Sequence, residues 1–123
     1  MVNLLTELYN LISAVVTNTY YQKADDGASF PYAVYKCPNI TSIGHYKQGR
    51  DDVTLEIDLW DNLKDQTRIE TLVRTLDLAL NGEMVNTDNV KMRLDKLTIL
   101  NIPDPDGFER RQLRYRIIAY QFD

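Results

Sequence analysis

Apolar residues recur at steps of three and four near the start of the chain and again in its middle. In the first segment, Val2 to Val16, the repeating residues are Leu4, Leu5, Leu8, Leu11, Ile12 and Val15. In the second segment, Gln66 to Leu80, they are Ile69, Leu72, Val73, Leu76 and Leu80. This spacing collects apolar side chains on one side of an α-helix. The pattern predicts two amphipathic helices, the second capped by Asn62 or Asp65.

Strict alternation of apolar and polar residues appears between Asp52 and Asp61. The apolar set is Val53, Leu55, Ile57 and Leu59, and the intervening set is Thr54, Glu56, Asp58 and Trp60. A period of two predicts a β-strand with its apolar set facing the core. Similar patterns predict strands over Tyr32–Tyr35, over Val90–Ile99 with a bulge near Asp95, and over Leu113–Tyr120.

The segment from Lys36 to Asp51 contains Pro38, Gly44 and Gly49 and has no comparable pattern. We predict either a long loop or a hairpin that projects from the body. Long irregular segments in compact domains are often functional.

These elements follow one another in the order helix, strand, hairpin or loop, strand, helix, strand, strand. They predict an α+β fold: a mostly antiparallel four- to five-stranded sheet with two amphipathic helices packed on one face. The length of 123 residues fits one domain spanning residues 1–123, and no internal repeat or linker divides it.

The second face of the predicted sheet mixes charged and aromatic residues. If the strands over Asp52–Asp61 and Leu113–Tyr120 are neighbours, acids can lie opposite bases as cross-strand pairs. Trp, Tyr and Arg together are typical of protein interfaces, whereas scattered apolar side chains also occur on ordinary solvated faces. We hypothesise a subunit or partner interface, with these candidates: Tyr46, Lys47, Arg50, Glu56, Asp58, Trp60, Arg114, Arg116 and Tyr120.

Composition argues against several functional classes. The chain has 18 acidic and 14 basic residues, a formal net charge of −4, which disfavours tight binding to nucleic acid. Cys37 is the only cysteine, so an intramolecular disulfide is excluded. The N-terminus lacks the features of a signal peptide, and no apolar run is long enough for a membrane span.

Candidate chemistry is sparse, and we expect no enzyme activity, no cofactor and no metal. His45 is the only histidine, and no serine or cysteine signature accompanies it. One His and one Cys fall short of a zinc site. The segment 44–51 has the glycine spacing of a phosphate-binding loop, but Arg50 and Asp51 replace the Lys and Ser/Thr. The segment 104–107 lacks most ligands of a calcium loop and is read as a turn.

Three consecutive signals resemble the tail-terminator (tail-completion) family of long-tailed bacteriophages and related prophages. They are Phe30-Pro31-Tyr32-Ala33-Val34-Tyr35, then Asp52-Val53-Thr54-Leu55-Glu56-Ile57-Asp58-Leu59-Trp60-Asp61, and a helix ending Leu80-Asn81-Gly82. With the first helix and the closing strand pair, the resemblance covers most of the chain.

The resemblance implies a virion structural protein, assembled in the host cytoplasm, that forms a ring at the head-proximal end of the tail tube. Such a ring, commonly a hexamer, stops tube polymerisation and contacts the tail tube protein and a head connector protein. DNA would pass through it without specific binding. Two alternatives stay open: another head–tail connector component, such as a stopper or adaptor, or a small α+β ligand-binding or regulatory domain with a deep apolar pocket.

Overall fold

The computed structural model describes residues 2–43 and 49–121 and contains the two predicted helices. Helix α1 spans Val2–Ser13 and helix α2 spans Thr67–Leu80. The N-cap residue of α2 is Gln66, which makes no side-chain capping bond, so neither Asn62 nor Asp65 occupies the N-cap position. Asp65 lies one residue earlier, and its Oδ1 accepts the backbone N–H of Thr67 at 3.0 Å. Asn62, the other candidate cap, instead accepts a hydrogen bond from the Arg68 side chain at 3.3 Å.

The sheet has six strands, so the expected four to five was too few. The strands are β1 (Thr19–Tyr21), β2 (Tyr32–Ile43), β3 (Arg50–Asp61), β4 (Met84–Asn86), β5 (Val90–Asn101) and β6 (Glu109–Gln121). Their spatial order is β1-β2-β3-β6-β5-β4. The two strands missed by the pattern, β1 and β4, have three residues each, which is too short for alternation to be recognised. All pairs are antiparallel except β1 and β2, which makes the sheet mixed.

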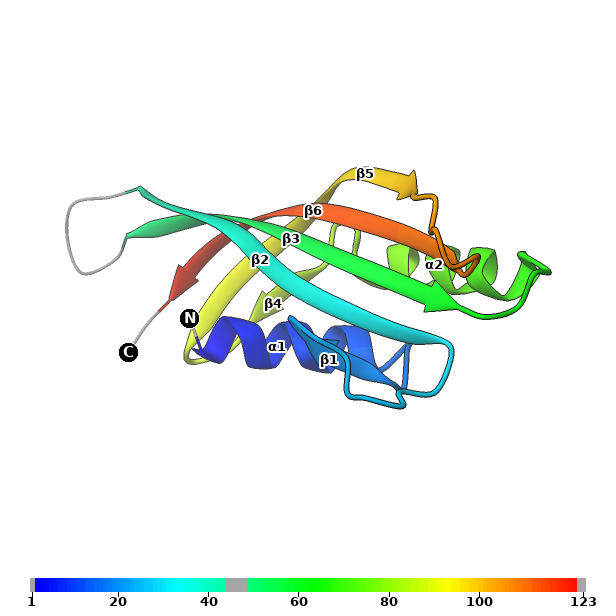
Figure 1. The fold of residues 1–123 in the computed structure, drawn as a ribbon. Helices are drawn as coiled ribbons and strands as arrows, with labels where there is room; N and C mark the ends of the chain where they lie inside the picture. Colours follow the sequence, from blue (N-terminus) through cyan, green and yellow to red (C-terminus); the bar gives the residue numbers. More distant parts are fainter. Residues whose placement is uncertain (1, 44–48, 122–123) are drawn as a thin grey trace.

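Strands β2 and β3 resolve the ambiguous segment in favour of a hairpin. Pairing continues from Tyr32 opposite Trp60 to Ile43 opposite Arg50, with a register shift between Lys36 and Asn39. The pair reaches beyond the rest of the sheet (Figure 1). The bulge expected near Asp95 is confirmed by a register shift in β5 between Lys96 and Thr98.

Both helices pack on one face of the sheet (Figure 1), as the sequence predicted. The core joins the apolar stripes of the helices to the inward residues of the central strands. It includes Leu4, Leu8 and Ile12 of α1, Ile69, Val73, Leu76 and Leu80 of α2, Val53, Leu55, Ile57 and Leu59 of β3, and Leu113, Tyr115, Ile117 and Ala119 of β6. Removing these side chains from water is the main force that holds the layers together.

Polar side chains fasten α2 to the sheet at three points. Buried Arg111 donates to Glu70 Oε1 at 2.7 Å and to Asn101 Oδ1 at 2.9 Å. The hydroxyl of buried Tyr115 donates to Asp77 Oδ1 at 2.6 Å. The fully buried carboxylate of Asp61 accepts from Arg68, with Nε at 2.8 Å from Oδ2. These bonds satisfy buried polar groups and set the position of the helix.

Candidate interaction surface

The face of the sheet opposite the helices is its open face, and the strand register decides which residues lie there. In β3 and β6, Glu56 lies opposite Arg114, and Trp60 lies opposite Arg110. Because β3 and β6 are neighbours, the predicted candidates Arg50, Glu56, Asp58, Trp60, Arg114, Arg116 and Tyr120 all lie on this face. The other two candidates, Tyr46 and Lys47, lie outside the described residues.

Ion pairs cross the centre of the open face, as the alternating charges predicted. Arg114 Nη2 lies 2.6 Å from Glu56 Oε1, and Arg116 Nη2 lies 3.0 Å from Asp52 Oδ2. Lys36 approaches Glu56 from β2, with Nζ at 3.6 Å from Oε2. The carboxylate of Glu56 is buried, whereas the side chains of Arg114 and Arg116 stay 41% and 49% exposed. A partner molecule would therefore meet guanidinium groups supported from beneath by acids.

An aromatic row occupies the end of the open face near the β5–β6 turn. Its members are Tyr20, Phe30, Tyr32, Trp60 and Phe108. Ring centroids of successive neighbours lie 5.1 to 6.3 Å apart, in stacked, tilted and edge arrangements. The Arg110 guanidinium lies 4.8 Å from the Trp60 ring and also donates to Asp58 at 3.1 Å. Such a cluster of rings and arginine is typical of protein interface centres.

Sequence reasoning found only Trp60 among these rings. Tyr20 is contributed by β1, which was not predicted, and Phe30 and Phe108 are brought together from two separate turns. The chain provides no local signal for such contacts, because Phe30 and Phe108 are far apart in sequence. Burial, with a smaller contribution from the Asp104 carboxylate, raises the pKa of Tyr32, so its hydroxyl stays protonated at neutral pH.

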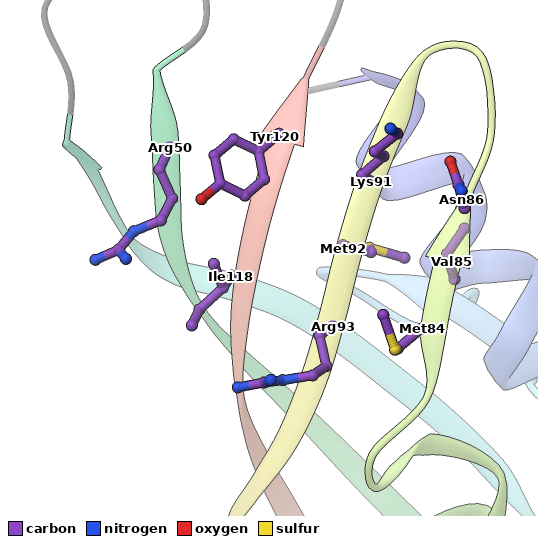
Figure 2. Close-up of a pocket in the computed structure, with 9 residues that line it drawn as sticks. All are labelled: Arg50, Met84, Val85, Asn86, Lys91, Met92, Arg93, Ile118 and Tyr120. Carbon is purple, nitrogen blue, oxygen red and sulfur yellow. The ribbon is translucent and has the colours of Figure 1, made fainter.

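A hollow of about 420 Å³ lies at the opposite end of the open face, between β4, β5 and β6 (Figure 2). Its lining residues are Arg50, Met84, Val85, Asn86, Lys91, Met92, Arg93, Ile118 and Tyr120. Three of these are cationic and none is acidic. Arg50 and Arg93 are each held by an acid outside the lining, with Nε at 3.2 Å from Asp52 and at 3.1 Å from Asp95 respectively. The hollow is part of the same surface as the predicted candidates Arg50 and Tyr120.

Reactive chemistry is weak in the described part of the chain. Burial raises the pKa of the Cys37 thiol to about 11, so the thiolate needed for nucleophilic attack is scarce at neutral pH. Within residues 2–43 and 49–121, no three His, Cys, Asp or Glu side chains are grouped so that they could bind a metal ion. None of the described helices has the length and apolar character to cross a membrane. The sole histidine, His45, lies outside the described residues.

Comparison with known proteins agrees with the architecture. A solved structure described as the virion of a native gene transfer agent (GTA) particle contains a chain with the same fold. The TM-score is 0.69 at 13% sequence identity, over 89% of this chain and 84% of that chain. No curated protein sequence matches the chain. The family model for the tail completion protein gp17 matches residues 5–120. The chain therefore belongs to the tail completion protein gp17 family and is a structural component of the virion tail.

Proposed function

We propose that this protein forms a ring at the head-proximal end of the tail tube, where it stops tube polymerisation and provides the surface that joins the head. The match of residues 5–120 to the tail completion family is the observation that carries the proposal. A ring needs a heterologous contact, in which two different patches of each subunit meet. The open face offers two distinct surfaces for such contacts, the aromatic row at one end and the cation-lined hollow at the other.

The aromatic and charged residues of the open face gain a physical role in this proposal. Trp60 and Tyr32 supply apolar area for a subunit or tube contact, and their rings stack with centroids 6.3 Å apart. Arg114 and Arg116 supply charge that acids already orient, which lowers the entropy cost of pairing with a partner's acids. We infer that the aromatic row supplies most of the affinity for the partner and that the arginines fix how the partner is aligned on the face.

Passage of DNA through the ring is compatible with the charge of the chain. With a net charge of −4 per copy, a ring of six would carry about −24, and each cation that contacted phosphate would add salt-dependent affinity. An acidic ring would let DNA slide. We propose that DNA passes without specific binding and that the partners held are the tail tube protein and the head connector protein.

Electron microscopy of particles assembled without this protein tests the proposal. We expect tails of uncontrolled length or tails that are not attached to heads, and restoration of both properties when the wild-type protein is supplied. Tails of normal length joined to heads in its absence would contradict it. Normal tail length combined with failed joining would instead favour the connector role, as a stopper or adaptor, because termination and joining are separate steps.

A further inference from the structure

The outer edge of β5 is left uncovered along its second half. Strand β4 pairs only with residues Lys91–Arg93, and the chain before β4 bonds the edge as far as Lys96, whose N–H donates to Asn81 Oδ1 at 3.1 Å. Among the described residues, no strand pairs with the outer side of residues 97–101. Three apolar side chains stay exposed here: Leu97 (55%), Ile99 (36%) and Leu100 (39%). An uncovered apolar edge strand is a template for pairing with another strand.

A second uncovered edge lies on the opposite side of the same sheet. Strand β1 pairs only with Ala33–Tyr35 of β2, and in the described part of the chain no strand pairs with the outer side of β2 after Lys36. Along this stretch Asn39, Ile40, Thr41 and Ser42 are exposed, and Ile40 keeps 43% of its surface accessible. The two uncovered stretches have similar lengths, and each lies beyond a three-residue edge strand.

Strand direction makes the two edges compatible. Successive strands in the order β2, β3, β6, β5 are antiparallel, so β2 and β5 run in opposite directions. A second copy in the same orientation would therefore present its β2 antiparallel to the first copy's β5. Ile40 is level with Leu94 across the sheet, so the second copy must be shifted along the strands by five residues to bring its Ile40 beside Ile99. No rotation of the copy within the sheet plane is needed.

The two edges also match in the faces of their side chains. Ile40 pairs with Val53 and Ile99 pairs with Leu113, both buried, so Ile40 and Ile99 belong to the face covered by helices. An antiparallel register that puts Ile40 beside Ile99 also puts Asn39 beside Leu100 and Thr41 beside Thr98, all on the open face. This arrangement would extend the apolar layer of one copy into the next, as cross-strand apolar pairs do within a sheet.

We propose that the uncovered edge of β5 in one copy pairs antiparallel with the uncovered edge of β2 in a second copy, with Ile99 beside Ile40. The contact is heterologous, so each copy uses one edge for each neighbour, and a rotation between copies that divides a full turn would close the series into a ring. This inference rests on the proposed ring, and it names the surfaces that build it. The pairing does not use the open face, so its aromatic row and its hollow can contact the tail tube, the head connector or a neighbouring copy.

Cysteine cross-linking in assembled particles tests the pairing. All variants are made in a Cys37→Ala background. In the first set each variant has two cysteines, one on β2 (Asn39→Cys or Thr41→Cys) and one on β5 (Thr98→Cys or Leu100→Cys). Within one chain these positions are separated by β3 and β6, about 14 Å at ~4.8 Å per strand, too far for a disulfide. A disulfide must therefore join two copies. Two-residue slips of register keep the faces matched, so the four combinations cover neighbouring registers.

We expect oxidation to give a ladder of linked subunits that ends at the full ring. Single-cysteine proteins, mixed in pairs, should link position 39 or 41 to position 98 or 100, and like positions should not link to each other. Leu78→Cys, on α2 and 76% exposed, serves as the control that should not link. Multiple copies at the head–tail junction without any of these cross-links would overturn the edge pairing and leave the proposed function standing. Absence of the protein from that junction would instead refute the proposed function.

Charged substitutions give an independent measurement. Leu100→Lys and Ile99→Lys should weaken self-association, or incorporation into particles, by at least about tenfold, because a charge on an edge strand opposes strand addition. Leu78→Lys should leave association unchanged while matching the change in charge. Urea unfolding of each monomer verifies that the fold is retained. Unchanged association for a folded edge variant would contradict the inference.

Discussion

At the scale of single residues, the buried charges of Asp61 and Arg111 lie on the helix side of the sheet and are structural. Asp61 has no exposed surface, and its carboxylate accepts hydrogen bonds from Arg68 and from the backbone N–H of Asn62 at 2.8 Å. The bond from Arg68 is the main reason that the pKa of Asp61 lies below its usual value, and burial opposes this shift. The carboxylate is thus stabilised in its ionised form at neutral pH.

Replacing Asp61 with Asn should lower the free energy of unfolding at pH 7 by about 1.5–3 kcal/mol, since a charged hydrogen-bond acceptor is lost. Because the pKa of Asp61 is lower in the folded protein than in the unfolded chain, its carboxylate stabilises the fold at pH values above the unfolded pKa of about 4. This stabilisation is lost as the pH falls through the pKa of the folded protein. Urea unfolding at pH 7 and pH 2.5 should therefore show a smaller difference between wild type and Asp61→Asn at the lower pH. Asp106→Asn, in an exposed turn, is the control. An equal difference at both pH values would contradict this assignment.

At the scale of elements, α2 is positioned by contacts that no local pattern predicts. The apolar stripe of α2 determines which side of the helix is buried, but it does not determine where the helix lies along the sheet. Arg111 fixes that position, because its guanidinium donates to Gln66 and Glu70 at the N-terminal end of α2 and to Asn101 at the end of β5. The planar group can donate in several directions at once, which a lysine ammonium at the same position cannot reproduce.

Arg111→Lys should therefore lower the free energy of unfolding by about 1–3 kcal/mol and increase hydrogen exchange in the first turn of α2. Chemical unfolding and amide exchange measure the two effects. Arg74→Lys, on an exposed position of the same helix, should change stability by less than about 0.5 kcal/mol. If both variants behaved alike, the guanidinium would not be what positions the helix.

At the scale of the whole molecule, the sheet has one face committed to the core and one face available to partners. Leu55 of β3 is fully buried on the first face, whereas Trp60 of the same strand is half-buried on the second face and stacks with Tyr32. The same strand therefore contributes to folding through one set of residues, and we propose that it contributes to assembly through the other. This division matches a protein whose role in a virion is to hold other subunits.

Two substitutions in β3 should separate these roles. Leu55→Ala should cost about 2–5 kcal/mol of folding free energy, because it leaves a cavity in the core. Trp60→Ala should leave a folded monomer and weaken oligomerisation or partner binding, measured by sedimentation of the free protein and by incorporation into particles. Tyr120→Ala, 41% exposed at the far end of the open face, tests whether the effect belongs to the aromatic row. Unfolding of the Trp60 variant would instead assign Trp60 to the core.

Periodicity in the sequence by itself determined the two helices, the strands β3, β5 and β6, the first four residues of β2, and the separation of the sheet into an apolar face and a charged, aromatic face. These features are local, because each repeats within one segment at the period of its secondary structure. The family resemblance, carried by the residues from Phe30 to Gly82, indicated the tail completion family that the model match confirmed.

Only the tertiary structure decided the remaining features, since they depend on pairs of residues that are distant in the chain. The three-residue strands β1 and β4 exist because long neighbours offer them edges to pair with. The aromatic row forms because strand order brings Tyr20, Tyr32 and Trp60 together. The uncovered edges of β2 and β5 follow from where those short strands stop. Which residues a segment leaves unpaired is a property of the assembled sheet, so no pattern within one segment can predict it.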